Sequence, residues 1–135
     1  MSNHIRYQFG KESRLKSRKE IQRVFSAGQS IFSPSLKAVW IHNNPFHQLQ
    51  AGISVSSRNF KKAVDRNRVK RLIRESYRLQ KHGLEEKLIQ HQLSVSIFFI
   101  YVGKELPTQQ QMHEAVLTII NKLINRFDEK NKTTS

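Results

Sequence analysis

The stretch LQAGISVSSRNFKKAVDRNRVKRLIRESYR, residues 49–78, decides which fold the chain can adopt. Its first part alternates apolar and polar residues, which predicts a strand with one apolar face: Leu49, Ala51, Ile53 and Val55. Its second part has helical spacing, and the side expected to face a sheet carries Val69, Leu72, Ile73, Ser76 and Tyr77. The stretch therefore predicts a strand that leads into a sheet-packed helix. We expect this helix to begin between Asn59 and Asp65, to run to about Lys81 and to end at His82-Gly83.

The opposite side of this helix is strongly basic. Residues 61–78 hold eight Lys or Arg and two acids, and the basic side carries Arg66, Asn67, Lys70, Arg71, Arg74 and Arg78. Only Glu75 is placed to pair with one of them, Arg71 at i−4, so the other cations repel one another by about a few tenths of a kcal/mol per pair. Like charges gathered on one face indicate a polyanionic partner rather than a solvated, salt-bridged helix.

The whole chain has the same excess of positive charge. Its 24 Lys and Arg against 10 Asp and Glu give a net charge of +14, which nucleic acid or an anionic membrane surface would neutralise. A membrane-surface helix needs apolar residues that are free to enter lipid, whereas the narrow apolar side here is needed for the core. Nucleic acid is therefore favoured, and the arginines favour RNA because guanidinium groups bind phosphate bidentately and stack on exposed bases.

The remaining segments predict a single α+β domain over residues 1–135, with a flexible basic arm at about 1–12. A capping box at Ser17 and Glu20 predicts the start of a first helix, which Gly28 would end. Strand-like patterns at 31–43 and 49–56 are expected to pair as an antiparallel hairpin.

Three more elements are expected towards the carboxyl end. LEEKLIQH, residues 84–91, predicts a short helix of its own, and the apolar run at 97–102 predicts a strand buried on both faces. An apolar stripe predicts a last helix from Gln111 to about Phe127, after which residues 128–135 are expected to fray.

Several classes of protein are excluded or disfavoured by composition. Cysteine is absent, which excludes disulfides, thiol nucleophiles and Cys-based metal centres. The amino-terminal residues lack a signal-peptide core, and the longest apolar run is too short to span a bilayer, so we expect a soluble, cytoplasmic protein. The acids are scattered and the histidines show no HExxH spacing, so we expect no catalytic or metal-binding residue in this chain.

The string GISVSSRNFKKAVDRNRVKRLIRESYR closely resembles the signature of the bacterial ribonuclease P protein component. The centre of that signature is here Arg66-Asn67-Arg68, a single residue, and then Lys70-Arg71. The upstream string SRLKSRKEIQRVFSAG is similar to the opening of the same family, a basic Arg-Leu-Lys followed by a helix ending in Val-Phe-x-x-Gly. The resemblance covers about residues 12–127.

The resemblance implies a two-layer α/β sandwich with a mixed central sheet, similar to domain 2 of ribosomal protein S5, with a left-handed βαβ crossover. It implies the small subunit of a ribonucleoprotein that removes 5′ leaders from precursor tRNA, with Mg²⁺ held mainly by the RNA subunit and the substrate. The implied partners are ribonuclease P RNA and precursor tRNA, without a membrane or an obligate protein partner. Contacts to the catalytic RNA would come from Arg66, Asn67, Arg68, Lys70, Arg71 and Arg74.

The resemblance also implies that the single-stranded leader is gripped in a cleft between the first helix and the sheet. Two aromatic residues match positions that would stack on leader bases, for about 1–3 kcal/mol per base whatever the sequence. Ile21 departs from the family's common Phe, and SSRNFKK replaces the usual Ser-Lys-Lys-x-Gly loop. The implied leader contacts are Phe25, Trp40, Arg58, Lys61 and Lys62.

Both aromatic residues have an alternative place in the core. Phe25 follows Val24 on an apolar helix face, so burial and exposure are equally expected. Val39 and Ile41 mark one strand face as the apolar one, which places Trp40 on the other face and favours an exposed platform. A structural RNA-binding protein of ribosomal type is the alternative function, and it would not need such exposed platforms.

Overall fold

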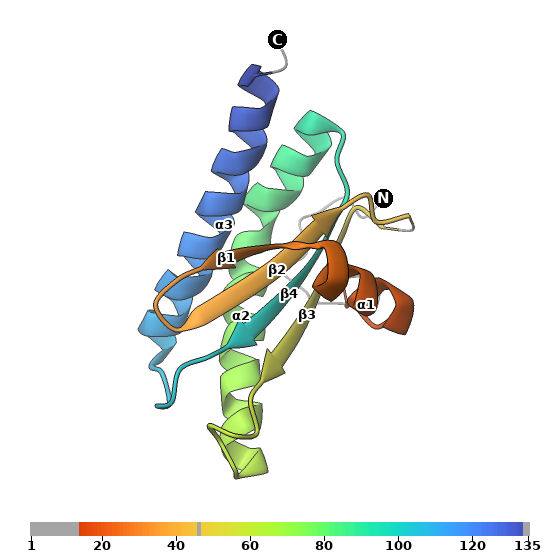
Figure 1. The fold of residues 1–135 in the computed structure, drawn as a ribbon. Helices are drawn as coiled ribbons and strands as arrows, with labels where there is room; N and C mark the ends of the chain where they lie inside the picture. The colour runs from red at the N-terminus through yellow and green to blue at the C-terminus, as the bar shows by residue number, and fades with distance from the viewer. Residues whose placement is uncertain (1–13, 46, 134–135) are drawn as a thin grey trace, which may run out of the picture.

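The computed structural model describes residues 14–45 and 47–133, which form one sheet with helices on both of its faces (Figure 1). The elements follow one another as α1 (Arg18–Ala27), β1 (Gln29–Phe32), β2 (Leu36–His42), β3 (Leu49–Val55), α2 (Ala63–His91), β4 (Val95–Tyr101) and α3 (Gln109–Thr133). The α+β class predicted from the sequence is confirmed. The expected arm at residues 1–12 lies outside the described residues.

The strand order is β1-β2-β4-β3, and the sheet is mixed. Both β1–β2 and β2–β4 are antiparallel, whereas β3 and β4 are parallel. The expected hairpin between segments 31–43 and 49–56 is therefore wrong, because β4 lies between β2 and β3. The most apolar strand takes the centre, where helices cover both faces. The true hairpin joins β1 to β2, at a break in the first segment that contains Pro34.

The connection from β3 through α2 to β4 is a left-handed crossover. In Figure 1 both strands run downward, β4 lies to the left of β3, and α2 returns upward behind the sheet. Most βαβ units have the opposite hand, so this is an exception to the general rule. It confirms the topology that the family resemblance implied.

One continuous helix, α2, replaces the two helices expected, one ending at about Lys81 and the other at 84–91, so the predicted stop at His82-Gly83 is wrong. A Cβ atom at Gly83 would meet no atom within 4 Å, and the buried residues Tyr77, Leu84 and Leu88 carry the apolar stripe past it. This packing outweighs the roughly 1 kcal/mol that glycine costs inside a helix. The helix instead ends at Gln92, whose φ of 55° is left-handed.

The last helix is also longer than expected. α3 begins at Gln109 and continues to Thr133, so the prediction that the tail frays from residue 128 is wrong as far as 133. At Asp128, a carboxylate oxygen lies 2.9 Å from His91 Nε2 and another 3.4 Å from Lys87 Nζ. These contacts tie the end of α3 to the end of α2.

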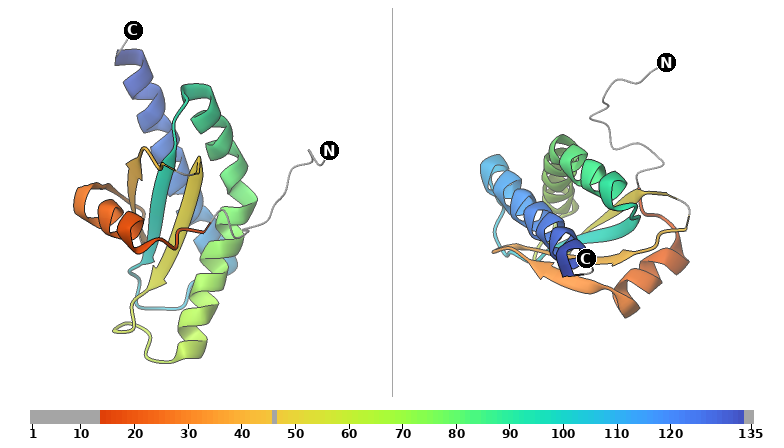
Figure 2. Two further views of the ribbon diagram at one scale, coloured as in Figure 1. Left: turned by 90° about the vertical axis from the view of Figure 1, so that its right-hand side faces the viewer. Right: turned by 90° about the horizontal axis from the view of Figure 1, so that it is seen from above.

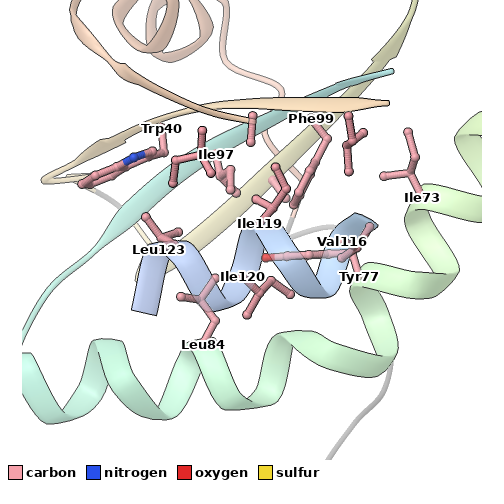
Figure 3. Packing of buried hydrophobic residues seen from close by; sticks show 14 of the residues in the cluster. Trp40, Ile73, Tyr77, Leu84, Ile97, Phe99, Val116, Ile119, Ile120 and Leu123 are labelled. Carbon is pink, nitrogen blue, oxygen red and sulfur yellow. The ribbon is translucent and has the colours of Figure 1, made fainter. Parts of the chain in front are cut away.

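The main core lies between the sheet and the pair α2–α3 (Figure 3). Tyr77 of α2 packs edge-on against Phe99 of β4 with ring centroids 5.3 Å apart, and Ile119 and Leu123 of α3 are fully buried. The side of α2 predicted to face the sheet is confirmed, with Leu72 half-buried at its margin and four residues buried: Val69, Ile73, Ser76 and Tyr77.

The short helix α1 packs on the opposite face of the sheet (Figure 2). Its Val24 is buried together with Leu15 and Val39 in a second, smaller core. The helix begins at Ser17, whose hydroxyl accepts a hydrogen bond from the Glu20 amide at 3.3 Å, as predicted. The sheet and the pair α2–α3 thus form the two expected layers, and α1 covers part of the opposite face of the sheet.

Candidate RNA-binding surfaces

The helix α1 covers only part of one face of the sheet. Strand register places on the α1 face three cross-strand rows: Ile41–Ser96–Gln50, Val39–Phe98–Gly52 and Lys37–Ile100–Ser54. α1 contacts the first row through Glu20 and the second through Phe25. The third, which we name the distal row, is only half-buried. In Figure 1 α1 lies over the upper right of the front face, and the strand ends at lower left have no described helix before them.

Phe25 lies at the surface of this partly covered face rather than in the core. Its side chain is 47% exposed, and its ring packs edge-on against Phe98 with centroids 5.1 Å apart. Gly52 makes this possible, because a Cβ atom there would lie 2.5 Å from two carbons of the Phe98 ring. The Phe98 ring therefore packs directly on the backbone of β3 at Gly52, and the Phe25 ring packs on Phe98. Of the two alternatives for Phe25, the exposed platform is the one that the structure favours.

Trp40 is not on the α1 face, and its prediction as an exposed platform is wrong. Its side chain is 1% exposed and packs edge-on against Phe127 of α3 at 5.4 Å. The prediction assumed that the face with Val39 and Ile41 was the apolar one. Both faces of β2 are apolar because helices cover both, so alternation could not show which face was open.

A polar network that the sequence did not predict fixes α1 to the sheet. The Glu20 carboxylate accepts hydrogen bonds from Arg23 Nε and Nη2, at 2.9 and 2.7 Å, and from Ser96 Oγ. Arg23 also donates to the carbonyls of His42 and Asn43, at the end of β2. Its guanidinium, assisted by the Ser96 hydroxyl, holds the pKa of Glu20 below its ordinary value although partial burial opposes this. Glu20, predicted only as part of a capping box, thus also holds the helix against the sheet.

The basic side of α2 is placed as predicted. Arg66 and Lys70 are half-buried, and the other four residues predicted to contact RNA are exposed: Asn67, Arg68, Arg71 and Arg74. Glu75 forms the expected pair with Arg71 at 3.3 Å, and both side chains are solvated. A groove beside this side is lined by Val64, Asn67, Arg68, Arg71, Leu72, Glu75 and Gln109.

Arg66 has a structural role that the sequence did not reveal. Its Nη1 donates to the carbonyls of Phe60 and Lys61, both at 2.8 Å, in the loop that precedes α2. Phe60 itself is buried against Tyr101, and Asn59 donates to the carbonyls of two residues after β4. The loop is thereby held without the glycine that its family pattern would supply. Its cations Arg58, Lys61 and Lys62 are all exposed.

No group of three or more His, Asp or Glu side chains in the described ranges 14–45 and 47–133 is arranged to hold a metal ion. Within the same ranges, no helix has the length and apolar character needed to cross a bilayer.

The sequence and the fold both match proteins of known family. The family model described as Ribonuclease P matches residues 9–127. The chain belongs to the ribonuclease P protein family. The ribonuclease P protein component of Porphyromonas gingivalis is 35% identical over 118 residues, which are 86% of each chain. That of Vibrio cholerae is 31% identical over 126 residues, covering 93% of this chain and 97% of the relative.

Solved structures of ribonuclease P proteins have the same fold. The Staphylococcus aureus RNase P protein superposes with a TM-score of 0.66 at 25% identity, covering 84% of this chain and 96% of that one. The Thermotoga maritima RNase P protein shares the fold, with a TM-score of 0.65 at 23% identity over 81% and 96% of the two chains. The role implied by the resemblance, an RNA-binding subunit of ribonuclease P in tRNA processing, is confirmed. The ribosomal-type alternative is not favoured.

Proposed function

We propose that this ribonuclease P protein binds the catalytic RNA through the exposed side of α2 and the 5′ leader of precursor tRNA in the α1 cleft. It thereby promotes removal of the leader by a catalytic centre on the RNA, in the cytoplasm. The observation that carries the proposal is the position of the loop with Arg58, Lys61 and Lys62, which leads from the end of β3 at the distal row into the basic side of α2. The protein surface that binds the leader can therefore be continuous with the surface that binds the catalytic RNA.

Electrostatics supports the assignment of α2 to the catalytic RNA. Arg68 and Arg74 are exposed, and Arg71 has one solvated carboxylate beside it, so the side remains strongly positive. Neutralising phosphates releases their counterions, which gives binding that weakens steeply with salt. A folded RNA offers many closely spaced phosphates to such a surface.

The cleft suits a single strand of varied sequence. Phe25 presents an aromatic ring that any base can stack on, and exposed cations lie in the loop that follows β3. Mg²⁺ would supply charge stabilisation at the scissile phosphate, held mainly by the RNA subunit and the substrate. The chain's own part is to hold the substrate, with no obligate second protein.

The cleft is tested by reconstituting the holoenzyme and comparing its affinity for precursor and mature tRNA. Phe25→Ala is expected to weaken precursor binding by about 5- to 150-fold, the equivalent of one stacked base, and to leave mature tRNA binding unchanged. The matched control is Ile89→Ala, which also removes an exposed apolar side chain, near the far end of α2. Equal loss for both RNAs would show that Phe25 does not touch the leader.

The basic side of α2 is tested by the salt dependence of binding to the catalytic RNA alone. Arg68→Ala with Arg74→Ala should lower the magnitude of the slope of log K against log salt by roughly 1.4–1.8, for two lost phosphate contacts. Arg68→Lys with Arg74→Lys keeps both charges and should keep the slope. A slope that does not change in the alanine variant would remove this side of α2 from the RNA interface.

A further inference from the structure

An exposed aromatic residue that the sequence did not single out lies on the open face of the sheet. Phe32 of β1 pairs with Lys37, which in turn pairs with Ile100, so Phe32 extends the distal row onto the edge strand. Residues directly opposite one another point to the same face of a sheet. Phe32 therefore lies on the same face of the sheet as Phe98 and Phe25, whereas Trp40 does not.

The environment of Phe32 differs from that of a core residue. Its side chain is 56% exposed, more than that of Phe25, and Lys37 Nζ lies 5.8 Å from its ring centroid. An exposed ring with a cation beside it combines the two elements that single-stranded nucleic acid sites use, a stacking surface and a phosphate partner.

Two further cations reach the same edge from α3. Lys122 Nζ donates to the Phe32 carbonyl at 2.7 Å, and Arg126 donates to the Gln29 side chain. They line a groove together with Ser30, Ile31, Phe32, Asn125 and Glu129. Lys37 lies beside the Phe32 ring, whereas Lys122 and Arg126 reach the same sheet edge from the side of α3, and Glu129 is the one carboxylate among the described residues that line the groove. The charge of this edge is therefore complementary to RNA.

We infer that Phe32 and Lys37 form a second stacking site for the leader, with Lys122 and Arg126 beside its phosphates. This inference rests on the proposed function, since it takes the leader onward from Phe25. Phe32 is two strands and two residues from Phe98, which is roughly 12 Å at ordinary strand spacings. That distance corresponds to about three or four nucleotides at stacked spacing. The proposal takes this second nucleotide to be farther from the cleavage point than the one on Phe25.

The test uses reconstituted holoenzyme and precursor tRNAs whose leaders are lengthened one nucleotide at a time. With the shortest leaders, the Phe32→Ala holoenzyme should bind precursor tRNA as tightly as the unmodified holoenzyme. Once the leader is long enough to reach the edge strand, the variant should bind at least about fivefold more weakly. Phe32→Tyr keeps a ring and should restore binding at every length. Phe25→Ala should already lower the affinity for precursor tRNAs with the shorter leaders. Ile89→Ala is the control for loss of an exposed apolar side chain.

The outcomes separate the two proposals. If Phe32→Ala equals the unmodified protein at every length while Phe25→Ala does not, the second site is refuted and the cleft stands. If neither variant shows any dependence on the leader, both are refuted. If Phe32→Ala weakens mature tRNA or the isolated catalytic RNA as much as the long-leader precursor, the ligand of Phe32 is not the leader, and the inference fails.

Discussion

Replacing Glu20 by Gln should loosen α1 from the sheet and with it one wall of the cleft. The carboxylate accepts from two nitrogens of Arg23 and from Ser96 Oγ, and the Glu20 and Arg23 side chains are only 11% and 34% exposed. Gln has the same shape but a single acceptor oxygen, and its amide nitrogen would face a donor. At least one of these hydrogen bonds is therefore lost outright, and those that remain lose their anionic acceptor.

The magnitude follows from the bonds affected. Hydrogen bonds to charged groups contribute about 1.5–3 kcal/mol each when partly buried, so a net loss of about 2 kcal/mol is expected. With an unfolding entropy of roughly 2.1 cal/mol/K per residue, 135 residues convert this to a fall in Tm of about 7 °C. Glu75→Gln is the matched control, since the Glu75 and Arg71 side chains are 38% and 75% exposed and their pair should contribute at most about 0.5 kcal/mol.

The assay is urea unfolding of both variants and the unmodified protein across acidic and neutral pH. Because the folded-state pKa of Glu20 is lowered, its contribution is fully present above the ordinary carboxyl pKa and disappears as the pH falls through the lowered value. The gap between the Glu20→Gln variant and the unmodified protein should therefore be widest near neutrality and close in acid. A loss no larger than that of the Glu75→Gln control, or a gap that widens in acid, would refute this account of the α1 contact.

Two further predictions concern Gly83 and Trp40, where the structure differs from what the sequence predicted. Gly83→Ala should raise the free energy of unfolding by about 0.5–1 kcal/mol in urea titrations, because Gly83 is helical and the new Cβ meets nothing within 4 Å; a helix stop there would make the change destabilising instead. Trp40→Ala should cost about 3–5 kcal/mol of stability, whereas Trp40→Phe, which keeps a ring against Phe127, should leave the ratio of precursor to mature tRNA affinity unchanged. A selective loss of precursor binding by folded Trp40→Phe would contradict the burial of this residue.

Local signals predicted the elements well wherever one feature dominated. The Ser17 cap, the existence of the apolar strand β4 and the two sides of α2 about Val69 and Arg74 all followed from spacing and residue type. Predicted helix ends were wrong where tertiary packing outweighed local helix propensity, as at Gly83 within α2. The sequence could predict that Asn67 and Arg74 lie on the exposed basic side of α2, but not that Arg66 would bind loop carbonyls.

What the sequence by itself determined is the character of the surfaces and the family, because charge, periodicity and a specific motif are properties of short segments. What only the tertiary structure decided is which residues share a face. β4 enters between β2 and β3, and this non-local pairing places Phe25, Phe98 and Phe32 on the open face while burying Trp40 beneath it. Strand order is set by long-range burial of apolar area, and alternation along one strand contains no information about which of two apolar faces a helix will leave uncovered.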